Sequence, residues 1–332
     1  MNNIGVVILN YNGYEDTIEC VESLSNQSDE SYQIIIVDNN SENDSYEKIK
    51  SWLYGDQIVY SKFLNKEFRK QKREFIELNY EKEIGFKQNI RSYNNNETYN
   101  CDKIVLINCD KNYGFLGGNN IGAKYVEFKN FQYVLLLNND TIIIDNYFLQ
   151  KLVSPFKSSE NIFLTGPNTI NFDGSFDSPM IEDTFLGNLF YLPILNSLRK
   201  LLKCPPVYID VKAISSPAPV PVYKVSGACM MFDTKKLKEI NYLDEGVWLS
   251  SEEAIISEKI KKKGGEIVFQ PITTLIHKKA QSPRPKSDRY NILKNHYMQR
   301  DYFYRKYRNY GMLKITMIRL MTKLRLIIEK IR

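Results

Sequence analysis

Short apolar runs that end in polar clusters recur through the first half of the chain. They cover residues 5–10, 34–37, 103–108 and 133–137. Between the first two runs, Ile18, Val21 and Leu24 repeat at helical spacing within residues 14–27. Strand, helix and strand in this order predict a βαβ unit. Because the strands are unbroken apolar runs, we expect an α/β fold whose mostly parallel sheet is covered by helices on both faces.

The polar clusters are the first candidates for a functional site. One follows each apolar run: residues 10–13 (NYNG), 38–41 (DNNS), 112–120 (NYGFLGGNN) and 138–140 (NND). In open α/β sheets, ligands bind just beyond the carboxyl ends of the strands. We therefore expect the four clusters to meet in one binding site at that edge of the sheet.

Two segments do not fit the alternation of strands and helices. Residues 54–102 are rich in Lys, Glu, Asn and Tyr, and they predict an excursion from the sheet, either a small helical insertion or a hairpin. Residues 204–221 contain five prolines, which predict an irregular surface loop.

The composition is that of an ordinary folded protein, with 43% hydrophobic and 25% charged residues among 332. A net charge of +6 is too small for a nucleic-acid-binding signature but suits an anionic substrate or membrane surface. Five scattered cysteines without a CxxC pair argue against a disulfide framework and favour a reducing compartment. The amino terminus predicts a strand instead of a signal peptide, and no apolar stretch reaches the roughly 20 residues of a membrane-spanning helix. These features together predict a cytoplasmic protein.

Seven segments, in order, resemble family 2 glycosyltransferases of the GT-A fold, and among them bacterial rhamnosyltransferase-like enzymes of capsule and O-antigen assembly. The segments are VVILNYNGYEDTIECVESL, IIIVDNNS, NYGFLGGNNIG, LLLNNDT, SGACMMF, SSEEAIISEKIKKKG and TTLIH. The resemblance covers about residues 1–53 and 103–280. It implies a GT-A domain over 1–285, with the insertion at 54–102, followed by a basic helical region over 286–332.

The resemblance places the family's metal motif, of DxD type, at Asn138-Asn139-Asp140. It implies that Asp140 is the principal ligand of a divalent cation, Mn²⁺ or Mg²⁺, that His277 completes the site, and that Asn138 reaches the ribose or the metal through water. Such a cation neutralises the charge on a departing diphosphate, and hard oxygen ligands suit it. The alternatives are that residues 138–140 merely form a turn and that His277 is structural.

The same resemblance implies that Asn10, Asn12, Asp38 and Asn40 bind the donor nucleoside, with Asp38 accepting a hydrogen bond from N3–H of uracil or thymine. An Asp at this place could instead cap the following helix. Gly117, Gly118 and Asn119, together with Asn139, are expected to let backbone amides approach the donor at a helix that opens near Asn119. The alternative is a tight turn that requires glycine.

Inversion at the anomeric carbon needs one carboxylate to remove the proton of the acceptor hydroxyl. The resemblance assigns this base to the acidic pair Glu252-Glu253 at the start of a helix. Many relatives have Glu-Asp here, so the second glutamate departs from the family pattern by one extra methylene; we choose Glu253, with Glu252 as its neighbour and substitute. Both could instead be first-turn acids that complement the helix dipole. Cys109 and Cys229 are expected in the core.

Beyond residue 286 the chain becomes basic, aromatic and then amphipathic. Apolar residues recur at helical spacing with Lys and Arg between them: Leu313, Met317, Leu320, Leu324 and Ile328. Such a helix can lie in a membrane interface, pack on the catalytic domain or form a homodimer. RNA binding is the rival interpretation, but no recognised nucleic-acid module accompanies the segment, and we expect no nucleic-acid partner.

The sequence thus predicts an inverting, metal-dependent transferase that moves a sugar from a UDP- or dTDP-sugar donor to a saccharide acceptor in bacterial surface polysaccharide synthesis. The pathway implies an acceptor on a polyprenyl diphosphate at the inner face of the plasma membrane. Two alternatives remain. A catalytically silent sugar-nucleotide-binding or scaffold protein would fit the single carboxylate of the NND cluster. A nucleotidyltransferase would need a basic glycine-rich loop after the first strand, which is lacking.

Overall fold

The computed structural model describes residues 3–25, 27, 31–61, 66–68, 71–88, 104–182, 184–185, 217–248, 251–279 and 286–331. The strands are β1 (Asn3–Asn10), β2 (Ser31–Asp38), β3 (Val59–Ser61), β4 (Lys66–Phe68), β5 (Phe75–Glu81), β6 (Gly85–Gln88), β7 (Ile104–Cys109), β8 (Tyr133–Asn138), β9 (Thr141–Ile143), β10 (Ile162–Asn171), β11 (Phe176–Ser178), β12 (Val220–Val222), β13 (Cys229–Asp233) and β14 (Glu266–His277). The helices are α1 (Tyr14–Leu24), α2 (Ser45–Tyr54), α3 (Gly114–Phe128), α4 (Phe148–Val153), the short 3-10 helix η2 (Ser154–Lys157), α7 (Thr234–Glu239), α8 (Glu252–Lys262), α9 (Lys286–Lys306) and α10 (Met312–Ile331).

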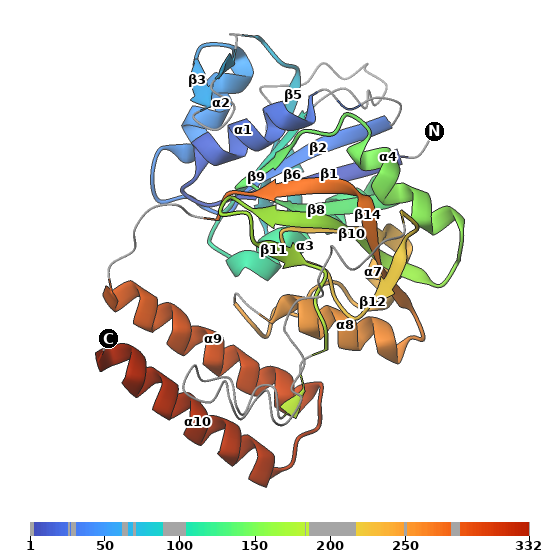
Figure 1. Ribbon diagram of the computed structural model, residues 1–332. Helices are drawn as coiled ribbons and strands as arrows, with labels where there is room; N and C mark the ends of the chain where they lie inside the picture. The colour runs from blue at the N-terminus through green and yellow to red at the C-terminus, as the bar shows by residue number, and fades with distance from the viewer. Residues whose placement is uncertain are drawn as a thin grey trace.

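One mixed sheet organises the molecule, in the order β12-β14-β10-β13-β8-β1-β2-β7-β5-β6. Strands β8, β1, β2, β7 and β5 run parallel, whereas β13 is antiparallel to both β8 and β10. Helices α1, α2 and α4 share one buried cluster with one face of the sheet, and α3, α7 and α8 share another cluster with the opposite face (Figure 1). The predicted α/β fold with a mostly parallel, doubly covered sheet is therefore confirmed.

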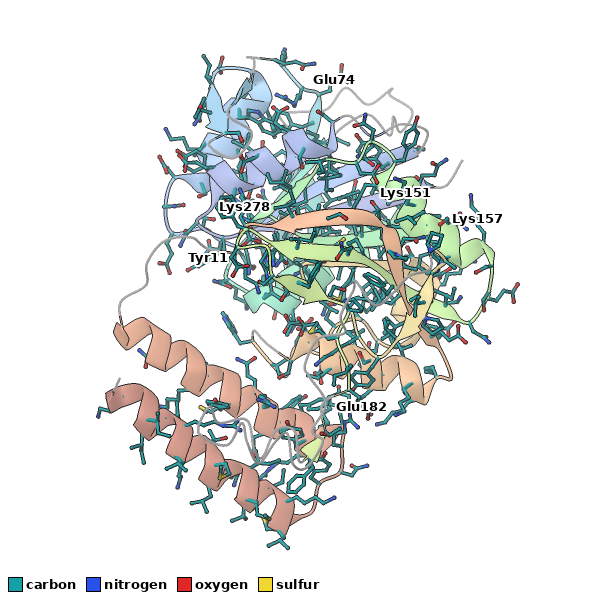
Figure 2. All side chains as sticks on the ribbon, viewed as in Figure 1. Tyr11, Glu74, Lys151, Lys157, Glu182 and Lys278 are labelled. Atoms are coloured by element: carbon teal, nitrogen blue, oxygen red, sulfur yellow. The ribbon has the colours of Figure 1, made fainter. Side chains whose placement is uncertain are left out.

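The register brings the predicted polar clusters together at one edge. Asn10 pairs with Asp38 in the ladder between β1 and β2, and Asp38 pairs with Asn108 in the ladder between β2 and β7. Asn138 lies opposite Leu9, since β8 is the other neighbour of β1. Figure 2 shows Tyr11 and Lys278, which come from distant parts of the chain, at the same edge of the sheet, away from Lys151 and Lys157.

Helix α3 begins at Gly114, five residues before the predicted start near Asn119. Its glycines permit a close approach to the sheet. A Cβ on Gly118 would lie 2.4 Å from Leu9 Cδ1, and a Cβ on Gly122 would lie 2.3 Å from Val7 Cγ1. Contacts this short would force the strand side chains to shift, so the close packing of α3 on β1 favours glycine at both positions.

The expectation that residues 54–102 leave the sheet is wrong in part. Phe75–Glu81 forms β5, which extends the main sheet parallel to β7, and Gly85–Gln88 returns antiparallel to it as β6. Among the described residues of this segment, only the β3–β4 pair forms a separate sheet. β5 lies next to the outermost strand β6, and Glu77 and Asn79 interrupt its sequence, so it lacked the unbroken apolar run by which the inner strands were found. Residues 62–65, 69–70 and 89–102 lie outside the described part.

The proline-rich segment is described only from residue 217 onward. Within it, Val220–Val222 forms β12, an edge strand antiparallel to β14, where a loop was expected. Proline is compatible with this place, because an edge strand leaves some backbone amides unpaired in any case. Residues 204–216 lie outside the described part of the chain, and so does the expectation for them.

Helices α9 and α10 form a hairpin beside the α/β body (Figure 1). Phe303, Tyr304 and Ile315 belong to the same buried cluster as residues of α3 and α8. Arg308, in the turn between the two helices, lies 3.2 Å from Glu258 of α8 and pairs with Glu182, whose position Figure 2 shows near the hairpin. The division into a domain ending at 285 and a helical region after it stays a prediction. None of the helices in the described ranges is both long and apolar enough to cross a membrane.

Candidate active site

An open cavity of about 520 Å³ lies at the carboxyl ends of the parallel strands. Its walls come from the loops after β1, β2, β7 and β8, together with the loop before α8: Leu9, Tyr11, Asn12, Gly13, Asp16, Asn39, Asn112, Gly114, Phe115, Asn138, Asn139, Asp140 and Trp248. Amides and carboxylates supply the polar atoms, whereas Tyr11 and Trp248 present exposed rings (41% and 58%). The predicted meeting of four polar clusters in one site is confirmed.

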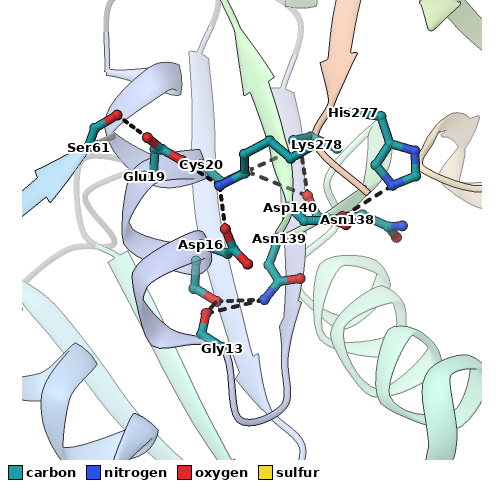
Figure 3. A network of polar contacts seen from close by, with 12 residues as sticks. Gly13, Asp16, Glu19, Cys20, Ser61, Asn138, Asn139, Asp140, His277 and Lys278 are labelled. Carbon is teal, nitrogen blue, oxygen red and sulfur yellow. Dashed lines mark hydrogen bonds and ion pairs between the residues drawn. The ribbon is translucent and has the colours of Figure 1, made fainter. Parts of the chain in front are cut away.

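Asp140 faces His277 within this site (Figure 3). The Nε2 atom of His277 lies 3.2 Å from Asp140 Oδ1, and its Nδ1 atom lies 3.4 Å from Asp177 Oδ2. Burial lowers the pKa of His277, but its two carboxylate neighbours outweigh burial and raise this pKa to about 9. Strand β14 brings His277 here because it pairs with β9, where His277 lies opposite Thr141.

The pair Asp140 and His277 fits a hard divalent cation that is shared with a phosphate ligand, once the cation displaces the proton that the two carboxylates hold on His277. Mg²⁺ in particular is usually held through one or two carboxylates plus substrate phosphates and water, not by an all-protein cage. The described residues contain no group of three or more His, Cys, Asp or Glu side chains placed to hold a metal. The remaining coordination positions would fall to phosphate oxygens and water, on the side where Asp140 lines the cavity.

Asp177 was not found by sequence reasoning, although it touches the predicted metal pair. It lies on β11, and it accepts hydrogen bonds from Ser226 Oγ (3.1 Å) and Lys279 Nζ (3.0 Å). Burial raises the pKa of Asp177, but His277 and Lys279 outweigh it and hold this pKa well below the usual range. Asp177 therefore stays ionised, and it lies 3.4 Å from His277 Nδ1, close enough to act on the ring through its charge.

Lys278 is a second residue that the sequence did not suggest. It forms ion pairs with Asp16 and Glu19 of α1, and its backbone N–H donates to the carbonyl of Asp140 at 2.8 Å (Figure 3). Asp16 lines the cavity, so Lys278 balances one of the two carboxylates found there. The hydrogen bond to Asp140 also ties the end of β14 to the turn after β8.

Asp38 and Asn10 lie beneath the loops of the site. Asp38 is 1% exposed, and its Oδ1 accepts hydrogen bonds from Asn10 Nδ2 (2.6 Å) and Ser41 Oγ (2.7 Å). It does not line the cavity, whereas its neighbour Asn39 does. The alternative of a helix cap is wrong, because the N-cap residue of α2 is Asp44. Recognition of a pyrimidine by Asp38 stays a prediction.

Asn12 and Asn40 share a left-handed backbone, with φ of 58° and 57°, but differ in position. Asn12 lines the cavity, and its Oδ1 accepts from Glu42 N at 2.8 Å, which joins the loops after β1 and β2. Asn40 is exposed and lies outside the lining of the cavity. Of this pair, the structure brings only Asn12 to the site.

Gly117, Gly118 and Asn119 lie inside the first two turns of α3, not in a turn that precedes the helix. All three are buried, and Asn119 Nδ2 donates to the carbonyl of Phe115 at 2.9 Å. None of the three lines the cavity, whereas Gly114 and Phe115, at the actual start of the helix, do. A direct donor contact by these three residues stays a prediction.

Asn138 and Asn139 both line the cavity next to Asp140. The side chain of Asn139 turns toward α1, where its Nδ2 donates to Thr17 Oγ1 at 3.1 Å (Figure 3). The backbone N–H of Asn138 donates to the carbonyl of Ala228 at 2.9 Å. This hydrogen bond joins the end of β8 to Gly227 and Ala228, the two small residues that precede β13.

Glu252 and Glu253 open helix α8, as predicted. Glu253 Oε1 accepts a hydrogen bond from Gly227 N at 3.2 Å, next to Ala228. Burial raises the pKa of Glu253, and the nearby Lys224 opposes this rise. A Cβ on Gly227 would lie 3.1 Å from an Oε1 atom of each glutamate, so the absent side chain makes room for both. Glu252 is buried, at 8% exposed.

The described cysteines, Cys20, Cys109 and Cys229, are buried free thiols. Burial raises the pKa of Cys20 to about 12 and raises the pKa of Cys109 and Cys229 as well, so none is a thiolate nucleophile at neutral pH. The expected core positions of Cys109 and Cys229 are confirmed. Cys101 and Cys204 lie outside the described residues.

Comparison with known proteins gives the site a family context. Residues 5–73 match the sequence model of Glycosyl transferase family 2. A curated relative, the low-salt glycan biosynthesis hexosyltransferase Agl10 of Haloferax volcanii, is 27% identical over 179 residues, which are 53% of this chain and 52% of that protein. The chain thus matches about half the length of this relative.

Two solved structures share the fold. GalNAc-T7 with UDP, GalNAc and Mn²⁺ aligns with a TM-score of 0.54 at 18% identity, over 92% of this chain and 50% of that one. The mannosyltransferase PcManGT of Pyrobaculum calidifontis with GDP-Man and Mn²⁺ aligns with a TM-score of 0.51 at 11% identity, over 89% and 63%. At these identities the likeness concerns the fold alone. Over residues 5–73 the chain is thus similar to the family 2 glycosyltransferases, and over most of its length it shares the fold of these two solved structures.

Proposed function

We propose that this protein is a metal-dependent, inverting glycosyltransferase that moves a sugar from a UDP- or dTDP-sugar to a saccharide acceptor. The observation that carries the proposal is that Asp140, which lines a cavity at the carboxyl ends of parallel strands, lies 3.2 Å from His277. The family match over residues 5–73 supports the class of reaction. The motif resemblance extends the proposal to bacterial surface polysaccharide synthesis with a lipid-linked acceptor.

Each of the residues in and around the cavity has a separate role in this proposal. Asp140 and His277 would hold the cation, which would supply positive charge to stabilise the diphosphate leaving group. Asp177 holds the second nitrogen of His277, and Lys278 balances the charge of Asp16. Asn12 and Asn39, which line the cavity, are available to the nucleoside side of the donor.

Glu253 accepts the proton of the attacking hydroxyl. A general base works best when its pKa is close to the operating pH. Burial moves the pKa of Glu253 in this direction, while the hydrogen bond from Gly227 N steadies the carboxylate. Gly227, which donates to Glu253, precedes Ala228, whose carbonyl accepts from Asn138 N, and this succession of contacts supports a base near the proposed metal motif.

Donor binding is expected to change the fluorescence of Trp248. The chain has two tryptophans: Trp52 is 1% exposed, whereas Trp248 is 58% exposed and lines the cavity. Titration with UDP- and dTDP-sugars in the presence of Mn²⁺ should therefore give a saturable fluorescence change and protect Trp248 from iodide quenching. The Trp248→Phe variant should lose this signal but keep the thermal stabilisation by the same ligand.

Absence of both signals with every nucleotide sugar would contradict the proposed function. A saturable signal without transfer to any saccharide acceptor would instead favour the silent binding protein.

Asp177→Asn is expected to weaken the response to metal by about 10- to 100-fold, the usual cost of losing a carboxylate that orients a metal-binding histidine. The concentration of Mn²⁺ that gives half-maximal nucleotide binding should rise, while nucleotide affinity at saturating Mn²⁺ should stay the same. Asp173→Asn, an exposed carboxylate of the same hairpin, is the matched control. An unchanged Mn²⁺ requirement in Asp177→Asn would remove this residue from the metal site.

A further inference from the structure

Helix α10 exposes a row of large apolar side chains. Leu313 is 76% exposed and Leu320 66%, and Met317, Leu324 and Ile327 are 40–56% exposed. Such side chains are normally covered in a folded protein, and a contiguous exposed set indicates an interaction surface. The five residues are called the α10 stripe below.

The α10 stripe occupies one side of the helix. Its members follow one another at intervals of four, three, four and three residues, and an α-helix turns once every 3.6 residues, so they align along its axis. The opposite side is the packed one: Ile315 is 2% exposed, Arg325 is 8% exposed, and Ile318 packs against the core. The stripe therefore faces away from the packed side of α10.

Charge is distributed very unevenly along the chain. Residues 286–332 contain 13 Lys and Arg but only 3 Asp and Glu, whereas residues 1–285 contain 32 basic and 36 acidic residues. The positive net charge of the protein is therefore due entirely to the segment that carries α9 and α10. On α10, exposed Lys314, Lys323 and Lys330 lie beside the stripe, and Arg319 is exposed next to it while paired with Asp301 of α9.

We propose that the α10 stripe docks on an anionic lipid surface. An apolar row flanked by lysine and arginine matches a bilayer interface, because the row enters the acyl boundary while the cations meet acidic headgroups. A second copy of this chain is the less favoured occupant, since its stripe would bring an equally basic flank against the first. The helix would lie in the interface plane, because none of the described helices is apolar enough to span a membrane.

Vesicle sedimentation of the full-length protein tests this proposal without donor or acceptor, so its outcome is separate from that of the transfer reaction. The protein should bind phosphatidylcholine vesicles that contain phosphatidylglycerol, bind pure phosphatidylcholine much less, and lose binding as salt is raised. The double variant Leu320→Glu/Leu324→Glu should lose about tenfold or more in vesicle affinity, because two apolar anchors become anions.

Phe128→Glu is the matched control, since Phe128 is also a highly exposed apolar residue (70%) but lies on α3. It should bind vesicles like the original chain. Absence of binding to anionic vesicles, or equal binding by the double variant, would overturn the proposal. A dimer in light scattering that dissociates in the double variant would assign the stripe to a second copy. A lowered melting temperature in the double variant without any vesicle binding would mean that the chain itself covers the stripe.

Discussion

Replacing Asp140 by Asn or Ala is expected to abolish the metal-dependent part of nucleotide binding and, with it, transfer. Asp140 is the carboxylate that faces His277 on the cavity wall, and without it a cation between protein and diphosphate loses its anionic protein ligand. We expect the affinity for UDP or dTDP in the presence of Mn²⁺ to fall about 100-fold or more. Calorimetric titration of the nucleotide in the presence of Mn²⁺, and again with EDTA, measures directly how much of the nucleotide affinity depends on the metal.

The fold should survive this change. The side chain of Asp140 is 22% exposed and its main partner is the ring of His277, so no core packing is lost. Glu160→Gln is a suitable control, because it removes a negative charge from an exposed residue just before β10, at the amino-terminal edge of the sheet. If Asp140→Asn keeps its Mn²⁺-dependent affinity, the metal assignment fails, whatever the activity of the variant.

The inner strands and the polar clusters at their ends could be predicted from the sequence because the local sequence signals agree in this region. The runs before Asn10, Asp38 and Asn138 are apolar throughout, and each stops at residues that favour turns. Parallel strands then bring those ends to the same edge, which makes a site there a geometric consequence of the pattern. The register Asn10–Asp38 and Leu9–Asn138 bears this out.

Asp177 and Lys278 could not be found in this way, because their contacts depend on long-range pairing. Asp177 reaches His277 only since β11 pairs with β10, which in turn pairs with β14. Lys278 meets Asp16 and Glu19 across more than 250 residues of sequence. In the sequence, each is one charged residue among many, with no spacing that marks it.

The role of the glycines in α3 could not be predicted from the sequence for a different reason. A missing side chain serves a close approach to a ligand and a close approach to a strand equally well, so residue type alone does not separate the two. In the structure Gly118 approaches Leu9, and Gly114 and Phe115 line the cavity in its place. Trp248 was not predicted as a site residue, because a single aromatic residue in a loop forms no recognisable pattern.

Glu253→Gln is expected to retain donor binding and to lower the rate of transfer by about 10²–10⁴-fold, the usual range for loss of a positioned base. The amide keeps the size of the side chain and can still accept from Gly227 N, but it cannot take up the acceptor proton. The fluorescence titration of Trp248 reports donor binding in the same variant. The comparison thus separates a loss of chemistry from a loss of affinity.

Glu252→Gln is the matched variant, one residue away in the first turn of α8. Glu253 contacts the segment that leads through Ala228 to Asn138, so we expect the larger loss of rate from its replacement. The dependence on pH should differ as well. Because burial raises the pKa of Glu253, the rate of the original chain should rise with pH through that raised pKa as the carboxylate ionises, and Glu253→Gln should lack this rise. Full transfer by Glu253→Gln together with a large loss in Glu252→Gln would move the base to Glu252.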